Sequence, residues 1–295
     1  MAYRLGYLDA LEAESIHILR ETAAGFAQPA MLYSMGKDSS VLLHLAQKAF
    51  FPGEAPFPLV HVDTTFKFPE MIAWRERIGA QWPAGLSSFV HPEGVAQGVN
   101  PVDNGLARCC AVWKTRGLLG ALAAGGIDAA IGGARREEER SRAKERVLSV
   151  RDSHGQWDPR RQRPELWQLL NTQLAPGETM RVFPLSNWTE LDVWRYIARE
   201  EIEVLPLYFA AVRRVVRRGD LLFTTTPDDP AGEDLSCRYR TLGCMPCTGA
   251  VPSTAATVED LIAELEAGDT SERATRAIDY DRDGAMELKK REGYF

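Results

Sequence analysis

The sequence predicts an α/β fold, a Rossmann-like parallel sheet with helices on both faces. Two observations predict it: short apolar runs of strand length alternate with amphipathic helical stretches, and the polar motifs follow directly after those runs. In open sheets of this kind, ligands bind outside the carboxyl ends of the strands. We therefore expect the functional residues to meet at one edge of the sheet.

The expected elements alternate along the chain. Apolar residues at near-helical spacing predict a first helix near residues 8–26. Further helices are expected from about Asp38, at 70–78, and after Thr189, which forms a capping box with Asp192. Four apolar runs are expected to form the sheet: 30–33, 59–63, 129–131 and 180–183.

Charge is unevenly distributed in this acidic protein. The net charge of −6 over 295 residues argues against a general nucleic-acid coat. The segment 135–163, however, holds ten Arg or Lys against six Asp or Glu, and a second basic run follows at 213–218. Such segments indicate an anion site or a docking face, or else a solvated helix face with mixed charges.

No apolar stretch is long enough to span a membrane, and the first fifteen residues lack the apolar core of a secretory signal. We therefore expect a cytoplasmic protein with no membrane partner. In a reducing compartment five cysteines are not expected to form structural disulfides, so clustered ones indicate metal or redox chemistry.

The stretch YSMGKDSS at 33–40 predicts an anion-binding loop. It joins an apolar strand to a helix, whose first backbone N–H groups are unpaired and carry the positive end of the helix dipole. Gly36 allows close approach of a ligand, and Lys37 adds a positive charge. The candidate nucleotide-binding residues here are Ser34, Gly36, Lys37, Asp38, Ser39 and Ser40.

A second motif, GGARREEERSRAKER at 132–146, follows the predicted strand at 129–131. Its arginines can present planar guanidinium groups to phosphate or sulfate. With Lys37, the candidate catalytic residues are Arg135, Arg136 and Arg142, and Arg146 is a further candidate for anion contact.

The pattern S-x-G-K-D-S resembles the loop of the PP-loop ATP pyrophosphatases, which cleave ATP between the α and β phosphates. Further stretches resemble the small subunit of the two-subunit bacterial sulfate adenylyltransferase, and they run from residue 8 to the C-terminus. They include HVDTTFKFPEM, RVFPLSNWTELDVWRYI, RYRTLGC, TSER and MELKKREGYF.

This resemblance implies a reaction in which ATP and sulfate give adenylyl sulfate and pyrophosphate. It implies ATP and Mg²⁺ as cofactors and a GTPase large subunit as partner. Asp63, at the end of the second strand, is expected beside the adenosine ribose, and Asp38 or Asp63 could help to hold Mg²⁺. We expect a nucleotide-binding domain at 1–210 and a C-terminal region with a docking tail at 211–295.

The cysteines depart from that family. Cys109 and Cys110 are adjacent, and Cys244 and Cys247 form a CxxC. This pattern resembles the four ligands of the [4Fe–4S] cluster in adenylylsulfate reductases. Structural zinc and four buried free thiols are the alternatives. Cys237 is a spare thiol or a sulfur acceptor.

The cysteines are also compatible with a second function. No cysteine follows Cys247, so the nucleophilic tail cysteine of a reductase is missing. Iron–sulfur PP-loop enzymes of DNA phosphorothioation offer an alternative, in which an activated nucleic-acid oxygen is replaced by sulfur. Cysteine desulfurase and DNA-acting proteins would then be the partners, with segment 135–163 on DNA phosphates. A third reading is a nucleotide-binding regulator without catalysis.

Overall fold

A six-stranded sheet forms the centre of the protein. We describe a computed structural model in which residues 5–138, 140–226, 228–268 and Glu272 are placed. The strand order is β3-β2-β1-β4-β6-β5, with β5 antiparallel and the other neighbours parallel. The strands are β1 (Pro29–Leu32), β2 (Leu59–Asp63), β3 (Leu86–Val90), β4 (Ala129–Ile131), β5 (Leu148–Arg151) and β6 (Thr179–Val182).

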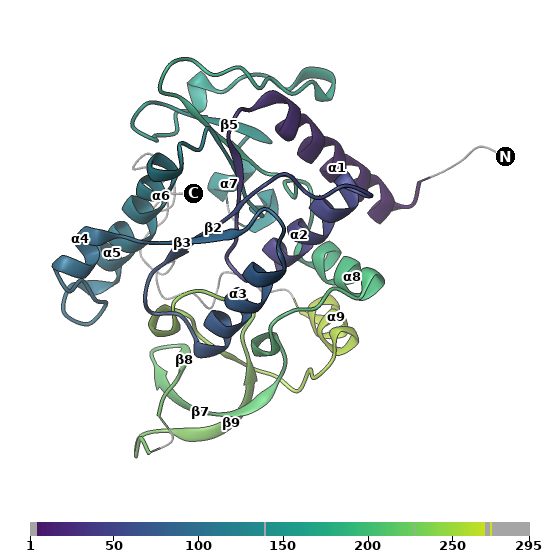
Figure 1. Cartoon of the computed structure of the whole chain (residues 1–295). Helices are drawn as coiled ribbons and strands as arrows, with labels where there is room; N and C mark the ends of the chain where they lie inside the picture. Colours follow the sequence, from purple (N-terminus) through teal and green to yellow (C-terminus); the bar gives the residue numbers. More distant parts are fainter. Residues whose placement is uncertain (1–4, 139, 227, 269–271, 273–295) are drawn as a thin grey trace.

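Helices cover both faces of this sheet, as the sequence predicts (Figure 1). On one face α1, α2 and α8 pack side by side, and α9 contacts α8. On the other face α6 packs on β2 and β3. The helices are α1 (Tyr7–Gly25), α2 (Lys37–Phe50), α3 (Pro69–Gln81), α4 (Pro92–Ala96), α5 (Gly105–Cys110), α6 (Gly117–Gly125), α7 (Arg140–Ala143), α8 (Glu190–Glu200) and α9 (Val258–Ala267).

The order of the strands creates a switch point at the centre of the sheet. From β1 the chain first extends the sheet to β2 and β3, and it then returns to place β4 on the opposite side of β1. The connections after β1 and β4 therefore diverge, which leaves a crevice at the carboxyl ends of these strands. Both predicted anion-binding motifs start there.

A second, antiparallel sheet of four strands was not predicted. Its order is β10-β9-β7-β8. The second basic run lies on its longest strand, so the interpretation of that run as a helix face was wrong. Its strands are β7 (Ala211–Arg218), β8 (Leu221–Thr224), β9 (Glu233–Arg238) and β10 (Val251–Pro252).

The remaining predicted elements are confirmed within a few residues. The four predicted strands correspond to β1, β2, β4 and β6, and the capping box of Thr189 and Asp192 begins α8. The expected docking tail and most of the TSER motif lie outside the described residues, which include only Glu272 of that motif. The division of the chain at residue 210 stays a prediction.

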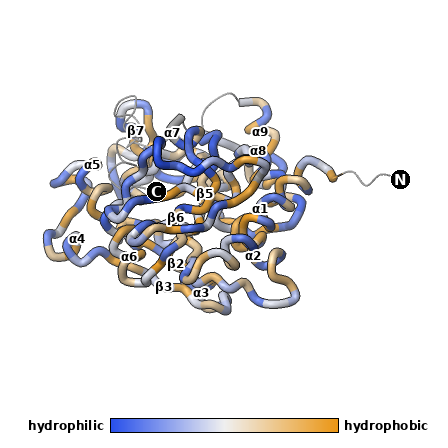
Figure 2. Tube along the Cα trace, turned by 90° about the horizontal axis from the view of Figure 1, so that it is seen from above, coloured by the Kyte–Doolittle hydropathy of each residue, from blue (hydrophilic) through white to orange (hydrophobic). Residues whose placement is uncertain are grey.

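The main core lies between the sheet and the α1–α2–α8 layer, and a smaller cluster lies under α6. Figure 2 shows hydrophobic and hydrophilic residues alternating along these helices, as expected for helices with one buried face. No helix in the described part of the chain is long and apolar enough to cross a membrane.

Candidate active site

The anion-binding loop after β1 is organised by its own side chains. Gly36 caps α2, and its carbonyl accepts hydrogen bonds from the hydroxyls of Ser39 (2.8 Å) and Ser40 (3.2 Å). The N–H of Lys37 donates to the hydroxyl of Tyr208 (2.8 Å), a buried residue from a distant 3₁₀ turn. The first turn of α2 is therefore held rigidly at the carboxyl edge of the sheet.

A network of buried opposite charges lies against this turn, and we call it the phosphate corner: Lys37, Asp38, Arg135 and Glu272. The ammonium of Lys37 pairs with Asp38 (3.2 Å) and with Glu272. The guanidinium of Arg135 pairs with Asp38 (2.8 Å) and also with Glu272. Two cations thus share two carboxylates, so the charges balance locally.

Ion pairing fixes the ionisation of these groups. Burial would raise the pKa of Glu272, but the charges of Lys37 and Arg135 outweigh it and hold that pKa well below its usual range. Burial would lower the pKa of Lys37, but Asp38 and Glu272 raise it instead. Lys37, Arg135 and Glu272 therefore carry full charges near neutral pH.

A close approach of two loops brings Arg135 to the phosphate corner. A Cβ added at Gly133 would lie 2.9 Å from the Cβ of Asp38, so only glycine fits without a shift of the loop. Arg135 follows two residues later, and its backbone N–H donates to the carboxylate of Glu138 (3.0 Å). The strand–loop geometry after β4 therefore directs the arginine onto the start of α2.

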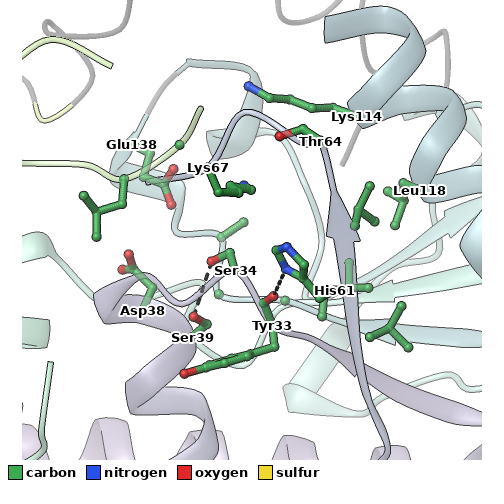
Figure 3. Close-up of a pocket in the computed structure, with 18 of the residues that line it drawn as sticks. Tyr33, Ser34, Asp38, Ser39, His61, Thr64, Lys67, Lys114, Leu118 and Glu138 are labelled. Carbon is green, nitrogen blue, oxygen red and sulfur yellow. Dashed lines mark hydrogen bonds between the residues drawn. The ribbon is translucent and has the colours of Figure 1, made fainter. Parts of the chain in front are cut away.

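A cavity of about 270 Å³ opens beside the phosphate corner (Figure 3). One part of its wall is polar, with Ser34, Ser39 and Asp38 from the loop. Another part is apolar, and it comes from β1, β2 and α6. A smaller cavity of about 80 Å³ adjoins it at Lys37 and Glu272. The apolar lining of the larger cavity includes Leu32, Val60, Val62 and Leu118.

The structure gathers most, but not all, of the predicted site residues. Arg142 lines both cavities and pairs with Glu138 (3.1 Å). Ser40 lies on the far side of the loop and lines neither of these two cavities. The predicted catalytic Arg136 also lines neither, because its guanidinium contacts Asn187 and the carbonyl of Glu145.

Asp63 lies at the end of β2, where its carboxylate is engaged in a turn. Its carboxylate accepts hydrogen bonds from Arg75 (2.6 Å) and from the backbone N–H of Thr65 (2.8 Å). Burial would raise its pKa, but these two bonds lower it. The carboxylate thus closes the turn after β2, and it does not line the cavity.

Several site residues were missed in the sequence. Glu138 lies inside the predicted arginine motif, where its carboxylate was counted only as charge. Lys67 and Lys114 line the cavity: Lys67 lies in the stretch HVDTTFKFPEM, where the sequence suggested no role for it, and Lys114 lies in the helical turn Ala111–Arg116. His61 stands inside a buried strand, and such a residue is indistinguishable from a core histidine by pattern. Glu272 is 235 residues from Lys37 in the chain, so no local signal predicts their contact.

The predicted metal ligands also come together, in what we call the thiol corner: Cys109, Cys110, Cys244 and Cys247. All four are buried. Cys247 is hydrogen-bonded to both Cys110 and Cys244, which are 134 residues apart in sequence. A bond between the hydroxyl of Thr64 and the sulfur of Cys244 (3.0 Å) links this corner to the cavity wall.

The thiols are not equivalent. The hydrogen bond with Cys247 lowers the pKa of Cys110 to about 6 against the effect of burial, whereas burial raises that of Cys109 to about 11. Among the described residues, no group of three or more His, Cys, Asp or Glu side chains has an arrangement that could hold a metal ion. The predicted [4Fe–4S] cluster and the zinc alternative are therefore not supported by the fit of the side chains. Cys237 lies apart, buried in β9.

Fold and site together define an α/β protein with a nucleotide-type anion loop, and the family comparison gives the class. The model of the phosphoadenosine phosphosulfate reductase domain matches residues 28–250. A solved structure of Candida glabrata FMN adenylyltransferase with FMN and an ATP analogue has a similar fold. Its TM-score is 0.51 at 13% identity, covering 100% of this chain and 88% of that one.

Much closer relatives identify the family. Sulfate adenylyltransferase subunit 2 of Myxococcus xanthus is 58% identical, covering 99% of this chain and 98% of the relative. The protein of that name from Azotobacter vinelandii is 55% identical and covers 100% of both. The chain therefore belongs to the sulfate adenylyltransferase subunit 2 family, as the sequence resemblance suggested.

Proposed function

We propose that this chain transfers the adenylyl group of ATP to sulfate, forming adenylyl sulfate and releasing pyrophosphate. The observation that carries the proposal is the phosphate corner: Lys37 and Arg135 converge on one carboxylate at the N-terminus of α2. Two cations and a helix N-terminus are the elements that bind a leaving pyrophosphate. The family, at 55–59% identity over nearly the whole chain, supports sulfate as the acceptor.

In this proposal the β and γ phosphates replace Glu272 as the partner of Lys37 and Arg135. The exchange keeps both cations paired, because one anionic partner takes the place of another, and the phosphates bring more negative charge than the carboxylate they replace. The two cations then stabilise the charge that develops on pyrophosphate as the bond to the α-phosphorus breaks. The hydroxyls of Ser34 and Ser39, which lie 3.3 Å apart at the cavity wall, can donate to the same phosphates.

In this proposal, further cavity residues bind the α-phosphate and the sulfate that accepts the adenylyl group. Lys67, Lys114 and Arg142 line the larger cavity, and we assign their positive charges to sulfate and the α-phosphate. Asp38 and Glu138 are the carboxylates that line it, and they fit Mg²⁺, which takes one or two carboxylates together with phosphate oxygens. When bound, the ion would neutralise phosphate charge.

The partners follow from the family rather than from the cavity. The name of the relatives, subunit 2, supports a second subunit for this chain, and we propose that it is the GTPase large subunit. Sulfur insertion into DNA, with a desulfurase and DNA-acting partners, has no support in these relatives. The [4Fe–4S] cluster stays a prediction.

The reaction is best tested in the direction that makes ATP. Adenylyl sulfate is a reactive mixed anhydride, so its pyrophosphorolysis is favourable and ATP is easily measured. Full-length protein, with the large subunit from the same genome, should convert adenylyl sulfate and pyrophosphate to ATP. The Lys37→Ala variant should lose about 100- to 1,000-fold in rate, the usual cost of one transition-state charge contact.

A matched control is available on the same helix. Lys48 lies in α2 but pairs with Glu12 and Glu200, away from both cavities. The Lys48→Ala variant should therefore keep its rate. Equal rates for the Lys37 and Lys48 variants would refute the role of the loop, and absence of ATP formation by the wild-type complex would refute the reaction.

A further inference from the structure

An unpaired ring nitrogen lies in the wall of the larger cavity. His61 is in the middle of β2 and is only 1% exposed. Its Nδ1 lies 2.8 Å from the backbone carbonyl of Tyr33, the residue directly after the neighbouring strand β1. Its Nε2 is buried and has no hydrogen-bond partner among the described residues. Figure 3 shows the ring joined to Tyr33 by its hydrogen bond, on the side of the cavity where Ser34 and Lys67 lie.

The contact with Tyr33 determines what the free nitrogen can do. A carbonyl oxygen only accepts, so Nδ1 must carry the proton and donate it. In the neutral ring, Nε2 is then an acceptor. A second proton is disfavoured, since the ring is buried and the positive charge of Lys67 is nearby. The cavity therefore presents one buried acceptor whose partner must be a donor on the ligand.

The surroundings of His61 suit the base of a nucleotide better than its phosphates. The cavity side chains of Leu32, Val60 and Leu118 form an apolar surface against which a flat heterocycle can pack. The charged groups of the phosphate corner lie at the other part of the wall. A nucleotide with its phosphates on Lys37 would thus extend its base toward β2.

We propose that Nε2 of His61 accepts a hydrogen bond from the 6-amino group of adenine and so selects ATP over 6-oxopurine nucleotides. The proposal rests on the proposed function, because it assumes that ATP occupies this cavity. Adenine carries a donor at position 6, whereas hypoxanthine and guanine carry an acceptor there. A 6-oxopurine would set oxygen against Nε2, leaving two buried acceptors without a proton between them.

Direct binding of nucleotides to the full-length protein tests this without catalysis. Calorimetry with ATP, ITP and 2′-deoxy-ATP, with Mg²⁺ and no sulfate, gives three affinities for each variant. His61→Phe removes the acceptor, so ATP affinity should fall roughly tenfold while ITP affinity changes little. His61→Asn offers an amide that can donate as well as accept, so it should bind ITP more tightly than the wild type does.

A matched control separates this effect from general damage to the protein. His154 is exposed and lies far along the chain in the turn after β5, so His154→Asn should leave all three affinities unchanged. Circular dichroism verifies folding, and His61→Asn, which keeps a polar side chain, serves if His61→Phe does not fold.

Two results would overturn the proposal. One is an unchanged ratio of ATP to ITP affinity in His61→Asn. The other is a preference for ATP over 2′-deoxy-ATP that disappears in the His61 variants while the preference for ATP over ITP is unchanged. That result would assign Nε2 to the ribose hydroxyl. Failure of the proposed function looks different: ATP binding would depend on His61, but no ATP would form from adenylyl sulfate and pyrophosphate.

Discussion

The phosphate corner and the thiol corner lie beside the same cavity, yet they are built in opposite ways. In the phosphate corner, full charges of opposite sign are matched: Lys37 and Arg135 share the carboxylates of Asp38 and Glu272. In the thiol corner, four side chains of one kind are gathered by packing, and hydrogen bonds join three of them.

This difference shows that the proximity of similar side chains does not by itself indicate a binding site. Buried charges must be paired, so the arrangement of the phosphate corner already indicates an anion as its ligand. Buried thiols have no such requirement, because cysteine packs well as a small apolar side chain. Their proximity alone therefore does not predict a metal, whereas the cations do predict phosphate.

The largest expected effect comes from removing one cation of the phosphate corner. Arg135→Met leaves Asp38 and Glu272 with Lys37 as their remaining partner in this network. Breaking such a buried network should lower the free energy of unfolding by about 3–5 kcal/mol. Urea denaturation measures this free energy of unfolding. Arg136→Met is the matched control and should cost about 1 kcal/mol, since that guanidinium is partly exposed, hydrogen-bonds an amide and a carbonyl, and has its carboxylate partner Glu165 at 4.0 Å. Equal losses would contradict the special status of Arg135.

An intermediate effect is expected from Glu272, through the pH dependence of stability. Its pKa in the folded protein is held below the ordinary value by Lys37 and Arg135. Its ion pairs therefore stabilise the protein fully above about pH 4.3, and this contribution is lost as the pH falls toward the folded-state pKa. Between pH 5 and 2, the wild type should lose about 1–2 kcal/mol more unfolding free energy than Glu272→Gln.

The same variant also tests the exchange of Glu272 for phosphate. Without the competing carboxylate, pyrophosphate should bind roughly tenfold more tightly at pH 7.5, which is about 1.4 kcal/mol. Calorimetry gives the affinity, and Glu137→Gln, which changes an exposed partner of Arg135, should bind as the wild type does. Weaker binding by Glu272→Gln would mean that this side chain supports the anion site and does not compete for it.

The smallest effect is expected in the thiol corner. If its members are only hydrogen-bonded thiols, Cys247→Ala should cost about 1 kcal/mol or less, similar to Cys237→Ala in β9. Metal-binding sites contribute far more to folding. A loss several kcal/mol above that control would contradict this view. Iron, sulfide or zinc that is present in the wild type purified without oxygen and missing from Cys247→Ala would likewise support a metal site.

The parts of the molecule that could be predicted from the sequence are those whose pattern lies within a single short segment. The loop at 33–40 and Arg135 follow strands directly, so their place at the sheet edge could be inferred from strand–turn–helix order. The small sheet was missed because β7 reads AVRRVVRR, where two apolar pairs interrupt the alternation typical of a half-buried strand. β5, with the sequence LSVR, is too short to signal its presence.

The rest of the site depends on contacts between distant segments. His61 is recognisable only once its ring is seen to have one nitrogen fixed and the other free. Glu272 acquires its role from cations 235 and 137 residues away. Arg136 adjoins Arg135 and shares its chemistry, yet the backbone turns it toward Asn187. Residue type and spacing could not separate these two arginines.

The wall of the larger cavity has a consequence for how the protein is made. It combines Tyr33 near the start of the chain with Leu242 and Gly243 near its end. Domains fold as units while synthesis proceeds from the N-terminus. A chain still emerging from the ribosome can form β1 to β4, but it has only part of the cavity wall. The complete wall of this cavity therefore forms only after the chain has been synthesised at least as far as Gly243.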